Sequence, residues 1–199
     1  MDRHPNILDR RRTALLIVDM QEKFAPVIQE YDRIEAQVIT LVKAFRIFDL
    51  PIFCTEQYPK GLGRTTESLR RELDGIEVIE KMHFTAVGET VLRALKRHAV
   101  THIVVVGIET HVCILQSSLD FAHLGYRVHV VRDATGSRRA SDRDAALERL
   151  QQHGVTVSCV ESVLFELVVV AGTDEFRQIS KLIKQGQVKV GSSLHLDGE

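Results

Sequence analysis

Three reactive side chains follow short apolar runs in this chain of 199 residues: a carboxylate, Asp19, an ammonium, Lys81, and a thiol, Cys113. Asp19 closes the run TALLIV at residues 13–18, and Lys81 follows a short run at residues 77–80. Cys113 lies in the turn after the run THIVVV. In a covalent hydrolase the thiol attacks, a carboxylate can take its proton, and a cation can stabilise the thiolate.

The turn that carries Cys113 runs from an expected strand into an expected helix. A cysteine near a helix N-terminus meets the positive end of the helix dipole, which lowers the pKa of the thiol. The first backbone N–H groups of a helix have no intrahelical partners, so they can bind an oxyanion that develops on a substrate. One turn could therefore supply the nucleophile and the oxyanion hole. A small apolar core cysteine fits the position equally well.

Asp19 and Lys81 each have an ordinary interpretation beside the catalytic one. Asp19 can act as a general base, or it can cap the next helix or lie in a loop. Lys81 can stabilise a thiolate and hold the carboxylate in place, or it can be a solvated surface lysine, as most lysines are. Neither residue is decisive by itself.

The remaining cysteines and histidines show no spacing typical of a metal site. Three widely spaced cysteines without a CxxC pair argue against both a disulfide framework and a zinc site. The chain has no HExxH run. Cys54 and Cys159 are expected in the core, and His111 is expected to line a pocket or lie on the surface. We therefore expect no metal and no cofactor.

Strand-like and helix-like segments alternate along the chain, which predicts an α/β fold with a parallel sheet and helices on both faces. Ligands bind outside the carboxyl ends of the strands in such sheets, so Asp19, Lys81 and Cys113 are expected to converge there. The strands are predicted at residues 13–18, 51–55, 77–80, 101–106, 126–131 and 155–158. The helices are predicted at residues 30–48, 88–98, about 112–124, 141–152 and 174–185, with a loop at 56–66.

Length and charge narrow the class of protein. The chain is long enough for one domain, residues 1–199, with polar tails expected at 1–12 and 187–199. A formal net charge of −1 gives no electrostatic case for a nucleic-acid or membrane partner. The first twelve residues lack the apolar core of a signal peptide, and the apolar runs are too short to span a membrane. We expect a cytoplasmic protein with a small-molecule substrate.

Three motifs in order resemble the isochorismatase-like cysteine hydrolase superfamily. They are TALLIVDMQEKF at residues 13–24, EKMHFTA at 80–86, and the stretch from VVVGIETHVC to DATGSR at 104–138. The resemblance covers nearly the whole chain. It implies a Rossmann-like three-layer α/β/α sandwich with a mostly parallel sheet of about six strands.

The same resemblance implies roles for particular residues. Asp19, Lys81 and Cys113 correspond to the catalytic triad of the superfamily. A cis peptide bond is expected just before the nucleophile turn, between Ile108 and Glu109. It would aim backbone N–H groups, those of Val112 or Cys113, at the oxygen of the substrate.

The stretch TEQYPKGLGRT at residues 55–65 resembles the branch of isochorismatase-domain-containing proteins. Nicotinamidases usually carry an Asp-Trp-His metal-binding run after this strand, whereas Glu56-Gln57-Tyr58 stands here. That difference argues against nicotinamidase activity and against a bound zinc. Isochorismatase itself cleaves a vinyl ether and need not use a cysteine. Cys113 therefore points to hydrolysis of a C–N bond in a small amide-type substrate through a thioester.

Five residues on loops next to the expected triad are candidates for the substrate pocket, although ordinary loop packing explains each of them as well. They are Phe24, Gln57, Tyr58, Leu62 and Thr110. Two other functions remain open. One is a binding or scaffolding protein that keeps the fold with little turnover. The other, an α/β nucleotide-binding protein, is disfavoured because no GxGxxG or GxxxxGK[ST] run is present.

The segment ESVLFELVVVAG at residues 161–172 is apolar on all sides after its first turns. A surface helix that covers a sheet normally keeps a polar face. This segment therefore suggests a homo-oligomer interface, and the superfamily resemblance implies dimers or larger rings. A position wholly inside the core of one subunit explains the segment equally well.

Overall fold

Within residues 3–190 the protein forms one six-stranded sheet in which every strand pairing is parallel. The structure is a computed structural model that describes residues 3–190, with side chains to residue 185. The strand order is β3-β2-β1-β4-β5-β6. The strands are β1 (Thr13–Val18), β2 (Ile52–Gln57), β3 (Val78–Lys81), β4 (His102–Ile108), β5 (Arg127–Gly136) and β6 (Thr156–Ser158).

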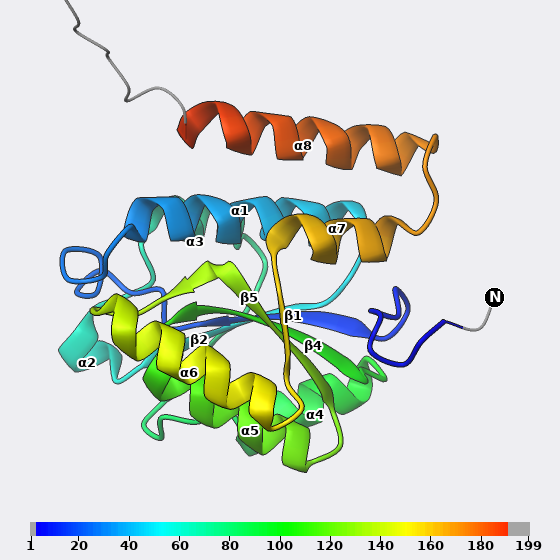
Figure 1. Ribbon diagram of the computed structural model, residues 1–199. Helices are drawn as coiled ribbons and strands as arrows, with labels where there is room; N and C mark the ends of the chain where they lie inside the picture. Colours follow the sequence, from blue (N-terminus) through cyan, green and yellow to red (C-terminus); the bar gives the residue numbers. More distant parts are fainter. Residues whose placement is uncertain (1–2, 191–199) are drawn as a thin grey trace, which may run out of the picture.

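Helices cover both faces of this sheet (Figure 1). On one face lie α1 (Tyr31–Ile47), α3 (Glu67–Glu72) and α7 (Val160–Val168); on the other lie α4 (Glu89–Arg97), α5 (Leu115–His123) and α6 (Ala140–Gln152). A four-residue helix, α2 (Pro59–Leu62), and a π-helix, η1 (Thr110–Ile114), lie in the connections after β2 and β4. The three-layer sandwich with a parallel sheet is confirmed.

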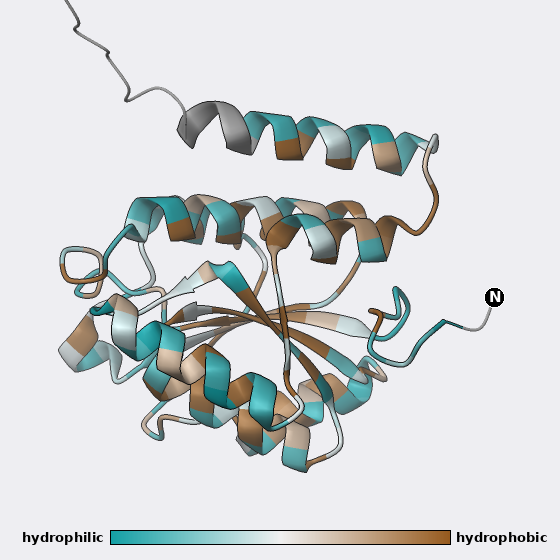
Figure 2. Cartoon of the chain, viewed as in Figure 1, coloured by the Kyte–Doolittle hydropathy of each residue, from teal (hydrophilic) through white to brown (hydrophobic). Residues whose placement is uncertain are grey.

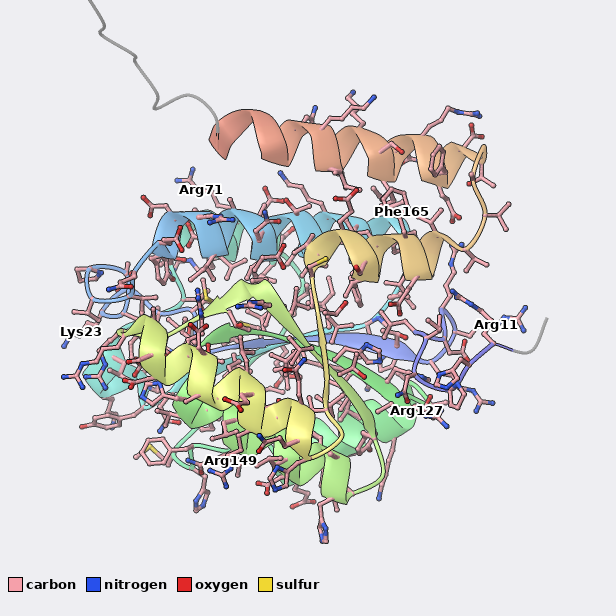
Figure 3. All side chains as sticks on the ribbon, viewed as in Figure 1. Arg11, Lys23, Arg71, Arg127, Arg149 and Phe165 are labelled. Atoms are coloured by element: carbon pink, nitrogen blue, oxygen red, sulfur yellow. The ribbon has the colours of Figure 1, made fainter. Side chains whose placement is uncertain are left out.

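The side chains of the central strand β1 point alternately to the two faces of the sheet, and each face has its own hydrophobic core. Leu15 and Ile17 of β1 face one helix layer, whereas Leu16 and Val18 face the other. Successive side chains of a strand point to opposite faces, so a strand covered on both sides must be apolar throughout. Figure 2 shows the strands in brown between helices that carry teal on their outer sides. Burial on both faces explains why β1 and β4 are the clearest apolar runs.

The last long helix, α8 (Asp174–Val190), lies outside the sandwich, on α1 and α7 (Figure 1). Its Ile179 is fully buried against them. The helix continues past residue 187, where the sequence predicted a polar tail, because one glycine weakens an amphipathic helix without ending it. Residues 191–199 lie outside the described part of the chain. No helix within the described part is long and apolar enough to cross a membrane.

The first twelve residues are also more than a polar tail where the structure describes them. Leu8 is fully buried, and its N–H donates to Oε2 of Glu166 at 2.9 Å. Arg10 pairs with Glu175 of α8 and lies over the ring of Phe48. The buried side chain of Leu8, its hydrogen bond to Glu166 and the two contacts of Arg10 therefore fasten this segment to the fold.

Two other predicted segments differ in extent. β5 runs to Gly136, beyond the predicted end at residue 131, because a register shift after Val105 lets Thr135 and Gly136 pair with the end of β4. The predicted loop at 56–66 contains the last two residues of β2 and the helix α2. Proline at the first position of α2 has the backbone angle that a helix needs there. The sequence prediction also lacked α3.

Candidate active site

The central strands β1 and β4 are neighbours, and the strand order reverses between them. A crevice forms at such a point because the connections from the two strands leave toward opposite faces of the sheet. Asp19 follows β1 directly, Lys81 is the last residue of β3, and Cys113 lies in η1 just after β4. The three residues therefore share the carboxyl edge of the sheet, as the order of strands requires.

Asp19 and Lys81 form a buried ion pair at this edge. Lys81 Nζ lies 2.7 Å from Oδ2 of Asp19, and the two side chains are 9% and 0% exposed. The hydroxyl of Thr55, on β2, donates to the other carboxylate oxygen at 2.8 Å. Both oxygens of Asp19 are therefore hydrogen-bonded, which offsets the cost of burying the charge.

Gln57 holds the ammonium of Lys81 from a second side. Lys81 Nζ donates to Oε1 of Gln57 at 2.7 Å, and Gln57 Nε2 donates to the carbonyl of Met82 at 2.8 Å. This contact follows from the sheet register, which places Gln57 of β2 directly beside Lys81 of β3. Gln57 was predicted as a pocket residue; the structure places its side chain against Lys81.

Cys113 is nearly buried, at 5% exposed, in an apolar cluster with Ala86 and Leu115. Burial raises the pKa of its thiol to about 12; the negative charge of Asp19 adds to this rise, and Lys81 opposes it. The expectation that a helix dipole lowers this pKa is therefore wrong. Cys113 is the fourth residue of η1, and burial outweighs any dipole there. The resting group is a neutral thiol beside a carboxylate.

The turn before Cys113 is held by Glu109. The peptide bond between Ile108 and Glu109 is cis. The carbonyl of Glu109 accepts the N–H of Val112 at 3.1 Å, so this N–H already has a partner. The carboxylate of Glu109 accepts the N–H and Nε of Arg138, at 3.0 and 3.1 Å. Glu109 thus ties the nucleophile turn to the segment after β5.

His111 makes a second tie to the same segment. Its Nδ1 lies 3.0 Å from the hydroxyl of Ser137. The sequence left two positions open for His111, in a pocket or on the surface; the side chain is half-buried. Ser137 and Arg138 were missed as site residues because they follow β5 at the part of the strand that the prediction did not include.

The remaining pocket candidates are dispersed. Phe24 is half-buried against the core, Leu62 is half-buried, and Tyr58 is 47% exposed. Thr110 is fully buried, and its hydroxyl has no hydrogen-bond partner within the described residues. Two hollows of the molecule, one between α1 and α8 and one at the amino-terminal segment, contain none of these residues. Among the pocket candidates, Gln57 is the one that contacts Lys81 in the described part of the chain.

Glu56 has partners of its own at the position where nicotinamidases carry a metal-binding run. Its carboxylate accepts the N–H and hydroxyl of Thr65, at 2.7 and 2.8 Å, and pairs with Arg64 at 2.9 Å. Burial raises the pKa of Glu56, but the contacts with Thr65 and Arg64 outweigh burial and lower it. Across residues 3–185, His, Cys, Asp and Glu side chains form no group of three or more that could hold a metal ion.

The other two cysteines differ from each other. Cys54 is fully buried, as predicted, and burial raises the pKa of its thiol to about 12. Cys159, predicted in the core, is half-exposed, and its Sγ lies 3.1 Å from the hydroxyl of Ser162. It precedes α7 at the end of the short outer strand β6, where no helix covers it completely.

A parallel sheet between two helix layers, with polar side chains gathered where the strand order reverses, defines a Rossmann-like α/β protein with a site at the carboxyl edge. Residues 13–162 match the isochorismatase domain family, and the chain belongs to that family. It is therefore a member of the isochorismatase-like hydrolase superfamily, as the three sequence motifs indicated.

Individual relatives cover most of the chain. Isochorismatase family protein 1B of Dictyostelium discoideum is 39% identical over 178 residues, which span 87% of this chain and 86% of the relative. The structure of the MAR1 ribonuclease of Caenorhabditis elegans superposes with a TM-score of 0.85 at 35% identity, covering 89% and 92% of the two chains. The Escherichia coli YcaC gene product, described as an octameric hydrolase of unknown specificity, shares the fold with a TM-score of 0.83 at 23% identity, covering 96% and 97%.

Proposed function

We propose that the protein is a cysteine hydrolase that cleaves a C–N bond of a small amide-type substrate through a thioester. The observation that carries this proposal is the position of the Cys113 thiol beside the buried Asp19–Lys81 ion pair. The thiol, the carboxylate and the ammonium lie at the same edge of the sheet, and the charges of Asp19 and Lys81 both act on the pKa of the thiol. Membership in a hydrolase superfamily supports the same reaction class.

The first half of the reaction forms the thioester. Asp19 accepts the proton of Cys113 as the sulfur attacks the carbonyl carbon of the substrate. The carbonyl oxygen becomes an oxyanion, which the N–H of Cys113 stabilises. Val112, the other donor considered, already donates to Glu109. The protonated Asp19 then gives its proton to the nitrogen that leaves, and the C–N bond breaks.

The second half returns the free enzyme. Water attacks the thioester carbon, and Asp19 accepts a proton from the water. The C–S bond breaks, and the sulfur regains a proton from Asp19, so that the acid product leaves and the thiol is restored. Lys81 keeps its charge throughout and holds the carboxylate in position. The raised pKa of Cys113 fits this cycle, because the thiol loses its proton only during attack.

A screen of amides, ureides and carbamoyl compounds for ammonia release tests the proposal. We expect the wild type to hydrolyse at least one compound that the Cys113→Ala variant does not hydrolyse. Mass spectrometry of a rapidly quenched reaction should show the mass of the acyl group on Cys113. Turnover that survives in Cys113→Ala would contradict the covalent mechanism.

RNA belongs in the same screen, because the structurally similar protein of Caenorhabditis elegans carries the name of a ribonuclease. We expect no RNA cleavage, since the net charge of −1 offers no attraction to phosphates. RNA cleavage that needs neither a metal nor Cys113 would contradict the proposed amide hydrolysis.

The alternative of a low-turnover binding protein is not favoured by the family. A binding protein of this kind would hydrolyse none of the compounds in the screen.

We also propose a homo-oligomer in the cytoplasm, where a free thiol stays reduced. At the end of α7, the apolar side chains Phe165, Val169 and Val170 are 41%, 53% and 58% exposed. The octameric assembly of the Escherichia coli YcaC gene product supports this proposal. Light scattering coupled to size exclusion should show more than one subunit, and Val170→Glu should reduce the mass. A monomer at micromolar concentration would contradict it.

A further inference from the structure

The short segment at residues 82–85 joins the two sides of the candidate active site. At its start, the Nζ of Lys81 lies 3.3 and 3.2 Å from the carbonyl oxygens of His83 and Phe84. At its end, the N–H of Ala86 donates to the hydroxyl of Ser117 at 2.8 Å. Ser117 lies one helical turn beyond Cys113 on the same run of helix. The segment therefore passes from the ammonium to the helix of the nucleophile.

Two large apolar side chains on this segment are left in solvent. Met82 is 68% exposed and Phe84 is 53% exposed. Their backbones are fixed, because the carbonyl of Met82 accepts Nε2 of Gln57 and that of Phe84 faces Lys81. Exposed apolar surface beside fixed polar contacts is costly in the free protein and is a feature of binding sites.

Tyr58 adds a third exposed ring on the neighbouring strand end. It follows Gln57, its N–H donates to the carbonyl of Lys81 at 2.9 Å, and it is 47% exposed. Its ring lies against the backbone of Gly61, where an added Cβ would be 2.2 Å from the ring. We call the three side chains of Tyr58, Met82 and Phe84 the apolar rim. Each is within three residues of Gln57 or Lys81.

The groups that would react are far more buried than the apolar rim. Asp19 is 0% exposed, Cys113 is 5% exposed, and the side chain of Lys81 is 9% exposed. So little exposure admits only a small head group, such as a carboxamide. A larger group attached to that head would remain at the surface, where Tyr58, Met82 and Phe84 are exposed within three residues of Gln57 or Lys81.

We propose that the apolar rim binds an alkyl or aryl substituent of the substrate, so that the enzyme prefers carboxamides with an apolar tail. The inference rests on the proposed amide hydrolysis and names the substrate class within it. We assign the apolar rim to the substrate because it adjoins the candidate active site. The backbone of Phe84 contacts Lys81, and the backbone of Met82 contacts Gln57. Transfer of each methylene from water to such a surface contributes about 0.8 kcal/mol, or roughly fourfold in binding.

A series of primary amides from acetamide to hexanamide, with benzamide, measures this preference. We expect kcat/KM to rise by about threefold to fourfold per methylene over the first few carbons. The double variant Met82→Ser, Phe84→Ser should flatten the series, so that the ratio of kcat/KM for hexanamide to kcat/KM for acetamide falls toward one. Leu124→Ser is the matched control, because Leu124 is 50% exposed at the far end of α5. A series that the double variant does not flatten would overturn the inference.

Alkylation of Cys113 tests the rim without any hydrolysis. We compare iodoacetamide with N-hexyl-iodoacetamide in Cys159→Ala protein, because Cys159 is a half-exposed free thiol. Mass spectrometry of the peptide that carries Cys113 follows the reaction. In Cys159→Ala protein the N-hexyl reagent should react at least about tenfold faster at low reagent concentration, and adding the double variant should remove this difference. If selectivity is present but no amide is hydrolysed, the proposed reaction fails and the rim stands. Equal rates in Cys159→Ala protein would overturn the rim.

A second copy of the chain could cover the same side chains instead. In that case the double variant would lower the mass measured by light scattering, and selectivity between the two reagents in Cys159→Ala protein would be absent. That combination would also overturn the inference. We expect the mass to be unchanged by the double variant.

Discussion

Lys81 donates to Asp19 across 2.7 Å in a site where the two side chains are 9% and 0% exposed. Such a pair is sensitive to the loss of one partner, because the remaining charge has no water around it. Lys81→Ala should therefore lower the free energy of unfolding by about 3–5 kcal/mol, measured by urea denaturation. The surface ion pair of Arg33 and Glu30 is the control, because its side chains are 51% and 55% exposed. Arg33→Ala should cost about 1 kcal/mol or less.

Lys81→Met and Asp19→Asn separate stability from catalysis. Lys81→Met keeps the length of the side chain but removes its charge, and Asp19→Asn keeps the shape of the carboxylate but cannot accept a proton. Each variant that stays folded should lose at least about a thousandfold in turnover, because grouped catalytic residues act as a unit. Turnover within tenfold of the wild type in folded Asp19→Asn would exclude Asp19 as the base.

Replacing Cys113 should remove activity and leave the fold. Cys113→Ser is close in volume, so the apolar cluster around it should remain packed, and the melting temperature should change by only a few degrees. Cys159→Ala is the control, because Cys159 is half-exposed and outside the site. It should retain full activity. Circular dichroism and ammonia release measure the two properties on the same samples.

Gln57 should act as a positioning residue for Lys81. In Gln57→Leu the ammonium loses an acceptor at 2.7 Å and can move away from Asp19. We expect kcat to fall by up to about 100-fold, while KM for acetamide changes little. Gln57→Glu keeps an acceptor and should recover part of kcat. A KM effect without a kcat effect would instead place Gln57 in direct contact with substrate.

The positions of Asp19, Lys81 and Cys113 could be predicted because their geometry follows from topology. Each residue comes directly after an apolar run, and parallel strands present their carboxyl ends at one edge. Runs such as residues 13–18 and 101–106 are apolar throughout, which only strands covered on both faces require. The order of the three motifs along the chain then identified the superfamily.

Three features of the site depend on contacts that the sequence does not specify. Gln57 meets Lys81 because β2 and β3 pair in one register, and a shift of one residue would turn its side chain to the other face. The pKa of Cys113 depends on how deeply the turn is buried. The N–H of Val112 already donates a hydrogen bond to the carbonyl of Glu109, so it is not free to bind an oxyanion. Each is a tertiary contact rather than a local pattern.

His129 should make the protein sensitive to acid. It is 1% exposed, neither ring nitrogen has a partner within the described residues, and burial together with the nearby His102 lowers its pKa to about 4. The unfolded chain binds a proton near pH 6.5, so stability is fully present above that pH and is lost as pH falls toward 4. The slope should approach about 1.4 kcal/mol per pH unit.

His129→Leu should flatten this acid slope and leave stability at pH 8 unchanged or higher. The substitution fills the same space and removes two buried nitrogens that lack partners. Urea titrations at pH 5 and pH 8 measure the difference directly. His153→Leu serves as the control, since His153 is exposed. An unchanged slope in His129→Leu would assign the acid sensitivity to another group.

Treatment with a chelator should leave hydrolysis unchanged. The mechanism proposed for Cys113 and Asp19 has no step that requires a metal, and Glu56 is already bound to Thr65 and Arg64. Dialysis against EDTA followed by the ammonia assay measures this, and elemental analysis of the purified protein provides the matching control. Stoichiometric zinc together with activity lost on dialysis would contradict the proposed mechanism.

The adjacency of β1 and β4 has a consequence for the nascent chain. Two strands and four helices separate them in sequence, yet every residue of β1 pairs with β4. Such distant pairings form late, because a long loop must close first. Asp19 and Lys81 can be in place before β4 has arrived, but Cys113 cannot. Until β4 is inserted, the thiol has no carboxylate beside it, so the proposed active site is assembled only when the sheet is complete.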